Sequence, residues 1–328
     1  MKVLVSGANG LLGHHVVSEL LKQYHVVRII VRNKRNIYFD LSSVEVYEGN
    51  FADYHFFKET AAGCDAIIHI AAVTGTNLLH YEDYYKINVE ASSQMIKVAD
   101  ELKINRLVFV STANTIGYGT KERPADESCA IEFPFSKSFY AQSKIEAEKL
   151  FLEASKKQDR HVLIINPTFI VGSHDSKPSS GKLLLLGYNR RLMFVPGGGK
   201  NFVAVKVVAT AVCNALTLGK NGEKYLVSGV NLSFKEFYQM QKSICEYNQK
   251  IIELPHIFLE LAGKAGDIIR MLNIKTEICS MNLNQLKIRE YYDYTKAKTE
   301  LNLPETDLKQ AIKEAIEWFI EKKHIHSV

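Results

Sequence analysis

The sequence predicts an α/β fold: a doubly wound parallel β-sheet with helices on both faces, followed by a smaller, mostly helical C-terminal region. Short apolar runs alternate with amphipathic stretches over the first 172 residues, which is the pattern of a parallel sheet. A glycine-rich turn follows the first apolar run directly. The alternation weakens from about residue 173. We therefore expect a first domain over 1–172, to which part of 200–230 returns, and a second, substrate-binding region over 173–328.

Short apolar runs with the length and composition of buried strands recur along the chain. They occupy residues 2–6, 26–31, 44–47, 66–70, 106–111, 162–166 and 225–228. Helices are expected between them. The stretch 14–21 repeats apolar residues at helical spacing, and the longer stretch 81–103 does so too. These are the elements of a sheet that is covered by helices on two faces.

Two amphipathic stretches dominate the C-terminal region. The apolar face of the first consists of Ile257, Phe258, Leu261, Ile268, Ile269 and Leu272. That of the second consists of Leu308, Ala311, Ile312, Ala315, Ile316, Phe319 and Ile320. Their polar faces carry both signs of charge, which favours packing on a protein core over membrane binding. We expect both apolar stripes to face the core.

The composition agrees with a soluble, globular enzyme. Hydrophobic residues make up 46% and charged residues 23% of the chain, which are ordinary globular values. A net charge of +5 is too small and too scattered to indicate nucleic-acid binding. No apolar run approaches the length of a membrane span. We therefore expect a small-molecule substrate, with neither nucleic acid nor membrane as a partner.

The cysteines indicate neither a disulfide framework nor a metal site. Cys64, Cys129, Cys213, Cys245 and Cys279 are widely spaced, odd in number and without a C-x-x-C pair. We expect no metal and a reducing compartment. The chain enters its first strand directly after Met1, which leaves no room for a signal peptide. The sequence therefore predicts a cytoplasmic protein.

Three glycines mark the turn after the first strand. Gly7, Gly10 and Gly13 have the spacing G-x-x-G-x-x-G, between a strand and a helix. Glycines permit a tight turn and let the backbone approach a diphosphate, while the free N–H groups and dipole of the helix N-terminus attract its charge. The turn therefore predicts a Rossmann-type, dinucleotide-binding domain.

A tyrosine and a lysine stand one helical turn apart. Tyr140 and Lys144 open a stretch with helical apolar spacing, so both lie on one face of a helix. Tyrosine has a pKa near 10 and is a poor base at neutral pH. A neighbouring ammonium stabilises the phenolate, so we expect Lys144 to lower the pKa of Tyr140 and make it a usable proton donor and acceptor.

A pair of hydroxyl residues ends the strand at 106–111. Ser111 and Thr112 stand where that strand meets its loop. In a doubly wound sheet, ligands bind outside the carboxyl ends of the strands. Thr112 is thus placed to hydrogen-bond a substrate carbonyl oxygen while Tyr140 protonates it.

Taken together, these residues resemble those of the extended short-chain dehydrogenase/reductases, the NAD(P)-dependent epimerase/dehydratase group. Dihydroflavonol 4-reductase-like and 3β-hydroxysteroid dehydrogenase-like members are the most similar. The resemblance covers nearly the whole chain. Its further motifs are the H-x-A-A strand end at 69–72, the N-V-x-G-like segment at 88–91, the P-x-x-x-x-G loop at 167–172 and the K-A-x-x-E-L segment at 296–301.

The resemblance implies a role for each matching residue. Thr112 would align the reacting oxygen, Tyr140 would be the acid/base, and Lys144 would hold the nicotinamide ribose. The cofactor would be bound by Gly7, Asn9, Gly10, Leu11, Leu12, Gly13, Arg32, Asn50, Phe51, Ala71, Ala72, Val73, Tyr140, Lys144, Pro167, Phe169 and Ile170. It also implies a homodimer formed by the helix that carries Tyr140 and the helix of 81–103.

The chain departs from the family pattern at several positions. Thr112 stands for the usual serine and Asn50 for an aspartate, and both keep a hydrogen-bonding side chain. Asn166 replaces the common arginine before the P-x-x-x-x-G loop. Ala204 and Val207 replace a histidine and an aspartate, so contacts that relatives make there are not carried over.

The residues after the second strand favour NADP(H), with NAD(H) also possible. NAD-specific sites place a carboxylate there to bind the ribose 2′-hydroxyl, whereas an arginine accommodates a 2′-phosphate. Here the strand is followed by Arg32-Asn33-Lys34-Arg35, and the first carboxylate is Asp40. Arg32 can pair with the phosphate, assisted by Lys34 or Arg35.

Three functions compete at this point. The first is an NADPH-dependent oxidoreductase that reduces an aldehyde or ketone. The second is a redox-neutral sugar-nucleotide epimerase, which the basic residues at 32–35 disfavour because such enzymes usually retain NAD. Dehydration is disfavoured because Ala113-Asn114 stands where dehydratases of the family carry an Asp-Glu pair. The third, a cofactor-binding regulator without activity, is disfavoured by the intact Thr112, Tyr140 and Lys144.

Overall fold

A seven-stranded sheet forms the centre of the protein, whose computed structural model describes residues 1–75 and 77–325. Its strand order is β10-β6-β5-β4-β1-β2-β3, and every pairing is parallel. The strands are β1 (Lys2–Ser6), β2 (Val26–Val31), β3 (Val44–Glu48), β4 (Ala66–His69), β5 (Arg106–Val110), β6 (His161–Pro167) and β10 (Lys224–Val227). The predicted strands are therefore confirmed, with bounds that differ by at most one residue.

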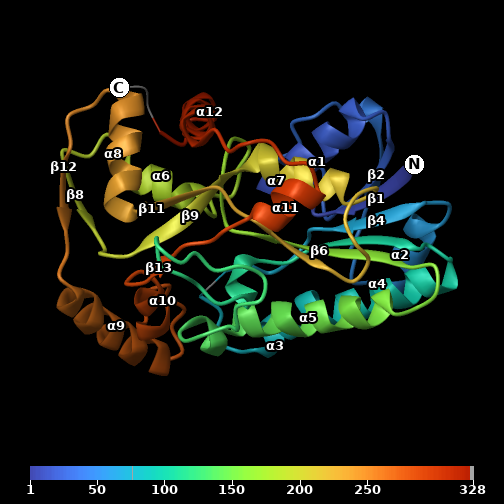
Figure 1. Cartoon of the computed structure of the whole chain (residues 1–328), viewed down its shortest axis with the longest axis horizontal. Coiled ribbons are helices and arrows are strands. Elements are labelled where there is room, and N and C mark those ends of the chain that lie inside the picture. The colour runs from blue at the N-terminus through green and yellow to red at the C-terminus, as the bar shows by residue number, and fades with distance from the viewer. Residues whose placement is uncertain (76, 326–328) are drawn as a thin grey trace.

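Helices cover the sheet on both faces (Figure 1). One face carries α1 (Leu11–Lys22) and α7 (Val205–Asn214), and the other carries α2 (Tyr54–Ala61), α4 (Ala91–Glu101) and α5 (Phe139–Ser155). Two apolar clusters fill the spaces between sheet and helices, because the side chains of each strand alternate between the two faces. The doubly wound α/β fold is thus confirmed.

The helix expected over 81–103 is one helical run with a wider turn inside it. It consists of α3 (Glu82–Tyr85), a π-helical turn (Lys86–Glu90) and α4. The side chain of Asn88 leaves this turn to bond residues outside it, with the Val73 amide donating to its oxygen over 2.8 Å. Such π-turns are frequent at functional sites because they aim one side chain out of the regular pattern.

The C-terminal region contains short strands as well as the helices α6 (Gly181–Gly187), α8 (Phe234–Cys245), α9 (His256–Met271), α10 (Ser280–Gln285) and α11 (Thr295–Glu300). In the larger of its two sheets, β9 (Gly199–Ala204) pairs with β7 (Phe169–Val171), β11 (Val230–Ser233) and β13 (Arg289–Glu290). In the smaller, β8 (Leu192–Val195) pairs with β12 (Lys250–Glu253). The region is mostly helical, as expected, but these short strands were not predicted. Each has only two to six residues and little polar–apolar alternation.

Of the two apolar stripes that were expected to face the core, one is buried and the other is exposed. Helix α12 (Leu308–Glu321) buries its stripe against the core, as expected. The prediction for α9 is wrong: its apolar residues face solvent, and Ile268 and Leu272 are 61% and 68% exposed. The buried residues of α9 are Gly263 and Gly266. A Cβ on Gly266 would lie 1.7 Å from the Ile278 carbonyl oxygen, so the helix packs through its glycines.

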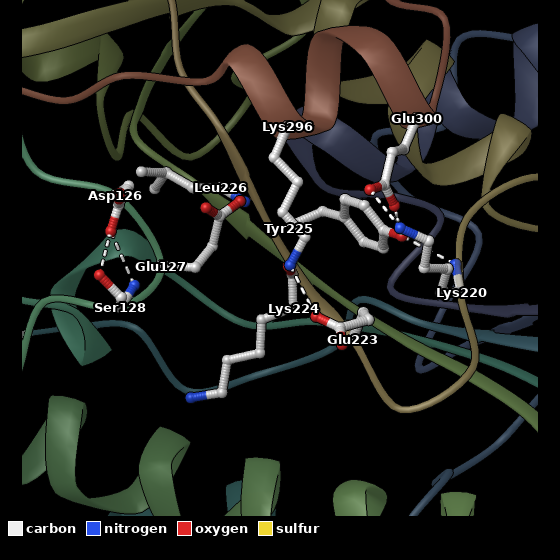
Figure 2. A network of polar contacts seen from close by, with 10 residues as sticks. All are labelled: Asp126, Glu127, Ser128, Lys220, Glu223, Lys224, Tyr225, Leu226, Lys296 and Glu300. Atoms are coloured by element: carbon white, nitrogen blue, oxygen red, sulfur yellow. Dashed lines mark hydrogen bonds and ion pairs between the residues drawn. The ribbon is translucent and has the colours of Figure 1, made fainter.

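Helix α11 fastens the C-terminal region to β10, the edge strand of the main sheet (Figure 2). Lys296 Nζ donates to Glu223 Oε2 at 2.7 Å and to the Lys224 carbonyl oxygen at 2.8 Å. Glu300 accepts a hydrogen bond from the Tyr225 hydroxyl at 2.6 Å. The K-A-x-x-E-L segment thus holds α11 against β10 through the side chains of Lys296 and Glu300. Among the described helices, none is long and apolar enough to cross a bilayer.

Candidate active site

The glycine turn brings the chain very close to the end of β4. Gly7 has a φ of +80°, and a Cβ there would lie 2.8 Å from the Ala71 nitrogen. A Cβ on Gly13 would lie 2.0 Å from the Gly7 carbonyl oxygen, so α1 packs directly on the turn. Only glycine permits both the backbone angle and these contacts. The turn therefore presents bare backbone at the N-terminus of α1, as diphosphate binding requires.

A cavity of about 560 Å³ opens at the ends of β1, β2 and β4. The predicted cofactor-binding residues that line this cavity are Gly7, Asn9, Gly10, Leu11, Leu12, Gly13, Arg32, Asn50, Phe51, Ala71, Ala72 and Val73. Arg32 is exposed at this cavity. Asp40, in contrast, caps a turn by accepting from the Ser42 amide at 2.9 Å and does not line the cavity.

A second cavity, of about 600 Å³, adjoins the first and shares Leu11, Leu12, Ile70, Ala72, Thr74, Lys177 and Ser179 with it. It is lined by the remaining predicted residues, which are Thr112, Tyr140, Lys144, Pro167, Phe169 and Ile170. The structure thus gathers every candidate catalytic and cofactor-binding residue around two connected cavities. This is the crevice at the carboxyl ends of the strands where ligands of doubly wound sheets bind.

Two polar side chains hold the loop that follows β4. The Ser6 hydroxyl lies 2.7 Å from His69 Nδ1 and accepts from the Ala71 amide at 3.3 Å. Asn88 Nδ2 donates to the Val73 carbonyl oxygen and to Ser143 Oγ, each over 3.0 Å. The loop is therefore fixed to β1 on one side and to α5, which carries Tyr140 and Lys144, on the other.

Thr112 and Tyr140 line the second cavity together, and the Thr112 side chain favours the phenolate form of Tyr140. Thr112 is 9% exposed, and its Oγ1 also accepts from the Asn114 amide at 3.2 Å. Burial raises the pKa of Tyr140 to about 12, and the Thr112 side chain acts in the opposite direction. The expectation that Lys144 lowers this pKa is wrong: burial penalises the phenolate most, the Tyr84 hydroxyl and Glu148 raise the pKa further, and Lys144 is not among the groups that shift it. Tyr140 therefore holds its proton at neutral pH.

Lys144 is a buried ammonium, 2% exposed. Its Nζ lies 4.0 Å from the centre of the Phe109 ring. Burial lowers the pKa of Lys144 to about 7, and the nearby carboxylate of Glu148 opposes that lowering. The protonation of Lys144 thus depends on Glu148.

Glu148 is a site residue that sequence reasoning missed. It is 1% exposed, and its Oε1 accepts from Ser111 Oγ at 2.6 Å, Thr115 Oγ1 at 2.7 Å and Asn166 Nδ2 at 2.8 Å. Its Oε2 accepts from Lys224 Nζ at 2.5 Å. Glu148 follows Lys144 by four residues, which was a signal for a shared helix face. Its partners come from distant segments and left no pattern in the sequence.

The loop after β7 was also missed as part of the site. Asp175, Ser176, Lys177 and Ser179 line the first cavity. Asp175 is 3% exposed and shapes the loop by accepting from the Ser179 and Gly181 amides at 2.8 and 2.9 Å. The sequence indicated only a polar loop here, because nothing local tells which sheet edge a loop will cover.

Comparisons with known proteins show the family to which the chain belongs. The model of the NAD dependent epimerase/dehydratase family matches residues 3–228. The chain belongs to that family. It is an NAD(P)-dependent oxidoreductase of the extended short-chain dehydrogenase/reductase type, and its cofactor is a nicotinamide dinucleotide.

The similarity to several relatives extends over almost the whole of both chains. The chain is 28% identical to the "Putative dihydroflavonol 4-reductase" of Synechocystis sp., over 96% of this chain and 93% of that protein. It is 24% identical to the sterol demethylase protein B of Methylococcus capsulatus, over 98% and 99%. The crystal structure of gox2253 is similar with a TM-score of 0.85 and 26% identity, over 99% of both chains.

Proposed function

We propose that the protein reduces the carbonyl group of a small aldehyde or ketone with NADPH. The observation that carries the proposal is that Thr112, Tyr140 and Lys144 line one cavity, which adjoins the one formed by the glycine turn. Thr112 orients the carbonyl oxygen and Tyr140 donates the proton to it. Relatives named as reductases support this direction, among them the 2-alkyl-3-oxoalkanoate reductase of Shewanella oneidensis, which is 26% identical over 68% of this chain.

The raised pKa of Tyr140 suits a proton donor. With a pKa of about 12, the phenol is fully protonated at neutral pH. Reduction of a carbonyl carbon leaves an alkoxide, which is a stronger base than a phenolate, so transfer from Tyr140 is downhill. When bound, the nicotinamide supplies the hydride. Tyr140 and Thr112 act only on the carbonyl oxygen, which Thr112 orients and Tyr140 protonates.

The residues of the first cavity fit an NADPH. The bare backbone around Gly7 and Gly13 would hold the diphosphate, with exposed Lys177 as a nearby cation. Arg32 would pair with the 2′-phosphate. The carboxylate in the lining, Asp175, is already engaged by the Ser179 and Gly181 amides. Lys144 would hold the nicotinamide ribose.

The assembly expected from the family is a homodimer through α5 and the helical run 82–101. A surface groove between α4 and α5, lined in part by Ile96, Leu150 and Ala154, supports this choice. Light scattering coupled to gel filtration distinguishes a monomer from a dimer. We also keep the prediction of a cytoplasmic location.

Isotope transfer separates the reductase from the epimerase. The protein is incubated with NADPH that carries deuterium at its transferable position and with a panel of aliphatic, aromatic and sterol ketones. A reductase forms an alcohol that has gained one deuterium for each NADPH oxidised. An isomer of an added sugar nucleotide, formed without net cofactor oxidation, would replace this proposal with the epimerase.

A further inference from the structure

Helix α9 and the segment that follows it present an apolar surface to solvent. Nine large apolar side chains between residues 257 and 278 are 40% to 83% exposed, and we call this group the α9 face. Its members are Ile257, Phe258, Leu261, Ile268, Ile269, Met271, Leu272, Ile274 and Ile278. Single exposed apolar residues are ordinary in proteins, whereas a large group of them marks an interaction surface.

The opposite side of α9 is held against the protein. A Cβ on Gly263 would lie 2.9 Å from the Cα of Ser280, the first residue of α10. Figure 1 shows α9 at the outer edge of the C-terminal region, with α10 on its inner side. Arg270 Nη2 donates to the Leu78 carbonyl oxygen at 2.7 Å, which ties the helix to the loop after β4. The packing on this side fixes the α9 face toward solvent.

The carboxylates of the segment 256–279 are already engaged by groups of the same chain. Glu260 and Glu277 form ion pairs with lysines elsewhere in the chain, at 3.2 and 2.7 Å. Asp267 is half-buried, and its Oδ1 accepts from the Ser280 amide at 3.0 Å. The negative charges of the segment are therefore compensated or turned inward.

Two lysines remain as unpaired charges at the α9 face. Lys264 and Lys275 are exposed, and neither has an ion pair within the described part of the chain. Lys264 comes three residues after Leu261 and four before Ile268, so it stands among the apolar residues of the face. A lysine can lay its apolar stem along such a surface and extend its ammonium to an anionic layer. The surface thus combines apolar side chains with positive charge.

This combination fits a bilayer with acidic lipids better than it fits a second copy of the chain. Two copies joined through the α9 face would bring their unpaired lysines together, while the carboxylates beside the face are already bonded. An acidic bilayer supplies an apolar layer for the side chains and negative headgroups for the lysines. Charges of both signs favoured a protein core at the level of sequence, and the pairing of the carboxylates removes that argument.

The α9 face continues to the rim of the candidate active site. Glu277 precedes Ile278 of the face, and its carboxylate accepts from Lys182 Nζ at 2.7 Å. Lys182 and Glu277 both line the cavity that contains Tyr140. Docking through the α9 face would therefore bring the rim of this cavity close to the docked surface.

We propose that the α9 face docks on the surface of a membrane that contains acidic lipids, with α9 lying in the plane of the interface. The helix has sixteen residues, too few for a membrane span, so it lies on the bilayer and does not cross it. The inference goes beyond the proposed reductase function and does not depend on it, because docking requires no turnover.

Vesicle flotation tests the apolar part of the surface. Vesicles consist of phosphatidylcholine alone or of phosphatidylcholine and phosphatidylglycerol in a two-to-one ratio. We expect wild-type protein to bind the mixed vesicles, and the Ile268→Gln/Leu272→Gln variant to bind them about tenfold or more weakly, because it loses apolar side chains without a change of charge. Leu41→Gln/Leu218→Gln is the matched control, since both leucines are exposed outside the α9 face.

The two lysines test the choice of lipid. Lys264→Gln/Lys275→Gln should weaken binding to the mixed vesicles by about ten- to thirtyfold and so remove most of the preference for them. Lys309→Gln/Lys313→Gln, at exposed positions on α12, should keep that preference. Circular dichroism establishes that each variant is folded.

Three vesicle results would refute the proposal: no binding of wild-type protein to either vesicle, an equal loss of binding in the leucine control, or a lipid preference that survives Lys264→Gln/Lys275→Gln. A dimer that dissociates in Ile268→Gln/Leu272→Gln, found without vesicle binding, would refute it as well, because a second copy would then cover the α9 face.

Discussion

The ammonium of Lys144 donates a hydrogen bond to the main-chain carbonyl oxygen of Val110, 2.8 Å away. Val110 ends β5 two residues before Thr112, and Lys144 follows Tyr140 by one helical turn in α5. This contact joins β5, which precedes the hydroxyl proposed to orient the carbonyl, to α5, which carries the proposed proton donor. We therefore propose a positioning role for Lys144 in addition to its contact with the ribose.

Replacing Lys144 by methionine keeps the length of the side chain and removes its charge and hydrogen bonds. We expect Lys144→Met to weaken NADPH binding and to lower kcat, because one side chain serves both purposes. Calorimetric titration and steady-state kinetics measure the two effects. Lys149→Met, an exposed position on the same helix, is the control. An unchanged NADPH affinity in Lys144→Met would exclude the ribose contact.

Removing the Glu148 carboxylate tests the electrostatic support of Lys144. Glu148 opposes the lowering of the Lys144 pKa, so Glu148→Gln lowers that pKa further below its value of about 7. We expect the fall of kcat/KM on the alkaline side to move to lower pH, and the rate at pH 7 to drop severalfold. Glu153→Gln, exposed on the same helix, leaves the profile in place. A uniform loss of rate with no shift along the pH axis would make Glu148 purely structural.

We predict that the choice of cofactor depends on Arg32. A 2′-phosphate brings roughly two negative charges, and a guanidinium can meet it with paired N–H donors. Wild-type protein is expected to bind NADPH ahead of NADH by about one to two decades. Arg32→Ala erases most of that margin with little effect on NADH, and Arg32→Asp favours NADH. Lys22→Ala, near the end of α1, is the control. Tightly bound NAD with no affinity for NADPH would refute this assignment.

Buried histidines make the protein sensitive to acid. His14 is 8% exposed and stacks on His174 with ring centres 3.8 Å apart. Burial lowers the pKa of His14 to about 3, whereas in the unfolded chain it stays near 6.5. Between these values the unfolded state binds the extra proton, so stability is lost as pH falls below 6.5.

For His14 alone, the loss between pH 7.5 and pH 5.5 is about 1.4 kcal/mol. His14→Phe keeps a ring for stacking and cannot titrate. The difference in the free energy of unfolding between the two pH values, measured with urea, should therefore be smaller by that amount in the variant than in the wild type. His55→Phe, at an exposed position, leaves the difference unchanged. An unaltered pH dependence in His14→Phe would mean that other groups govern acid stability.

The features that the sequence predicted are local ones. Each of them is defined within one element or turn. Examples are an apolar run of five residues, glycines three positions apart, and a tyrosine four residues before a lysine. The topology of a parallel sheet then places the ends of β1, β4 and β5 at one edge. That is why Gly7, Ala71 and Thr112 were found without knowledge of any tertiary contact.

The features that the sequence did not predict depend on partners far along the chain. Lys200 and Glu290 are ninety residues apart and meet only through the register of β9 and β13. The apolar face of α9 could not be placed, because helical spacing shows which residues share a face but not which face is covered. The pKa of Tyr140 depends on burial, which no motif reports.

The reduction of a carbonyl by NADPH with Tyr140 as proton donor is the central claim, and a single-turnover measurement on Tyr140→Phe tests it most directly. NADPH-saturated protein is mixed rapidly with a ketone that the wild type reduces, and NADPH oxidation is followed by absorbance. The affinity for NADPH is measured separately by calorimetry. The account predicts a rate ~10²–10⁴ below wild type, with NADPH affinity retained. A folded Tyr140→Phe variant that oxidises NADPH at close to the wild-type rate would contradict it.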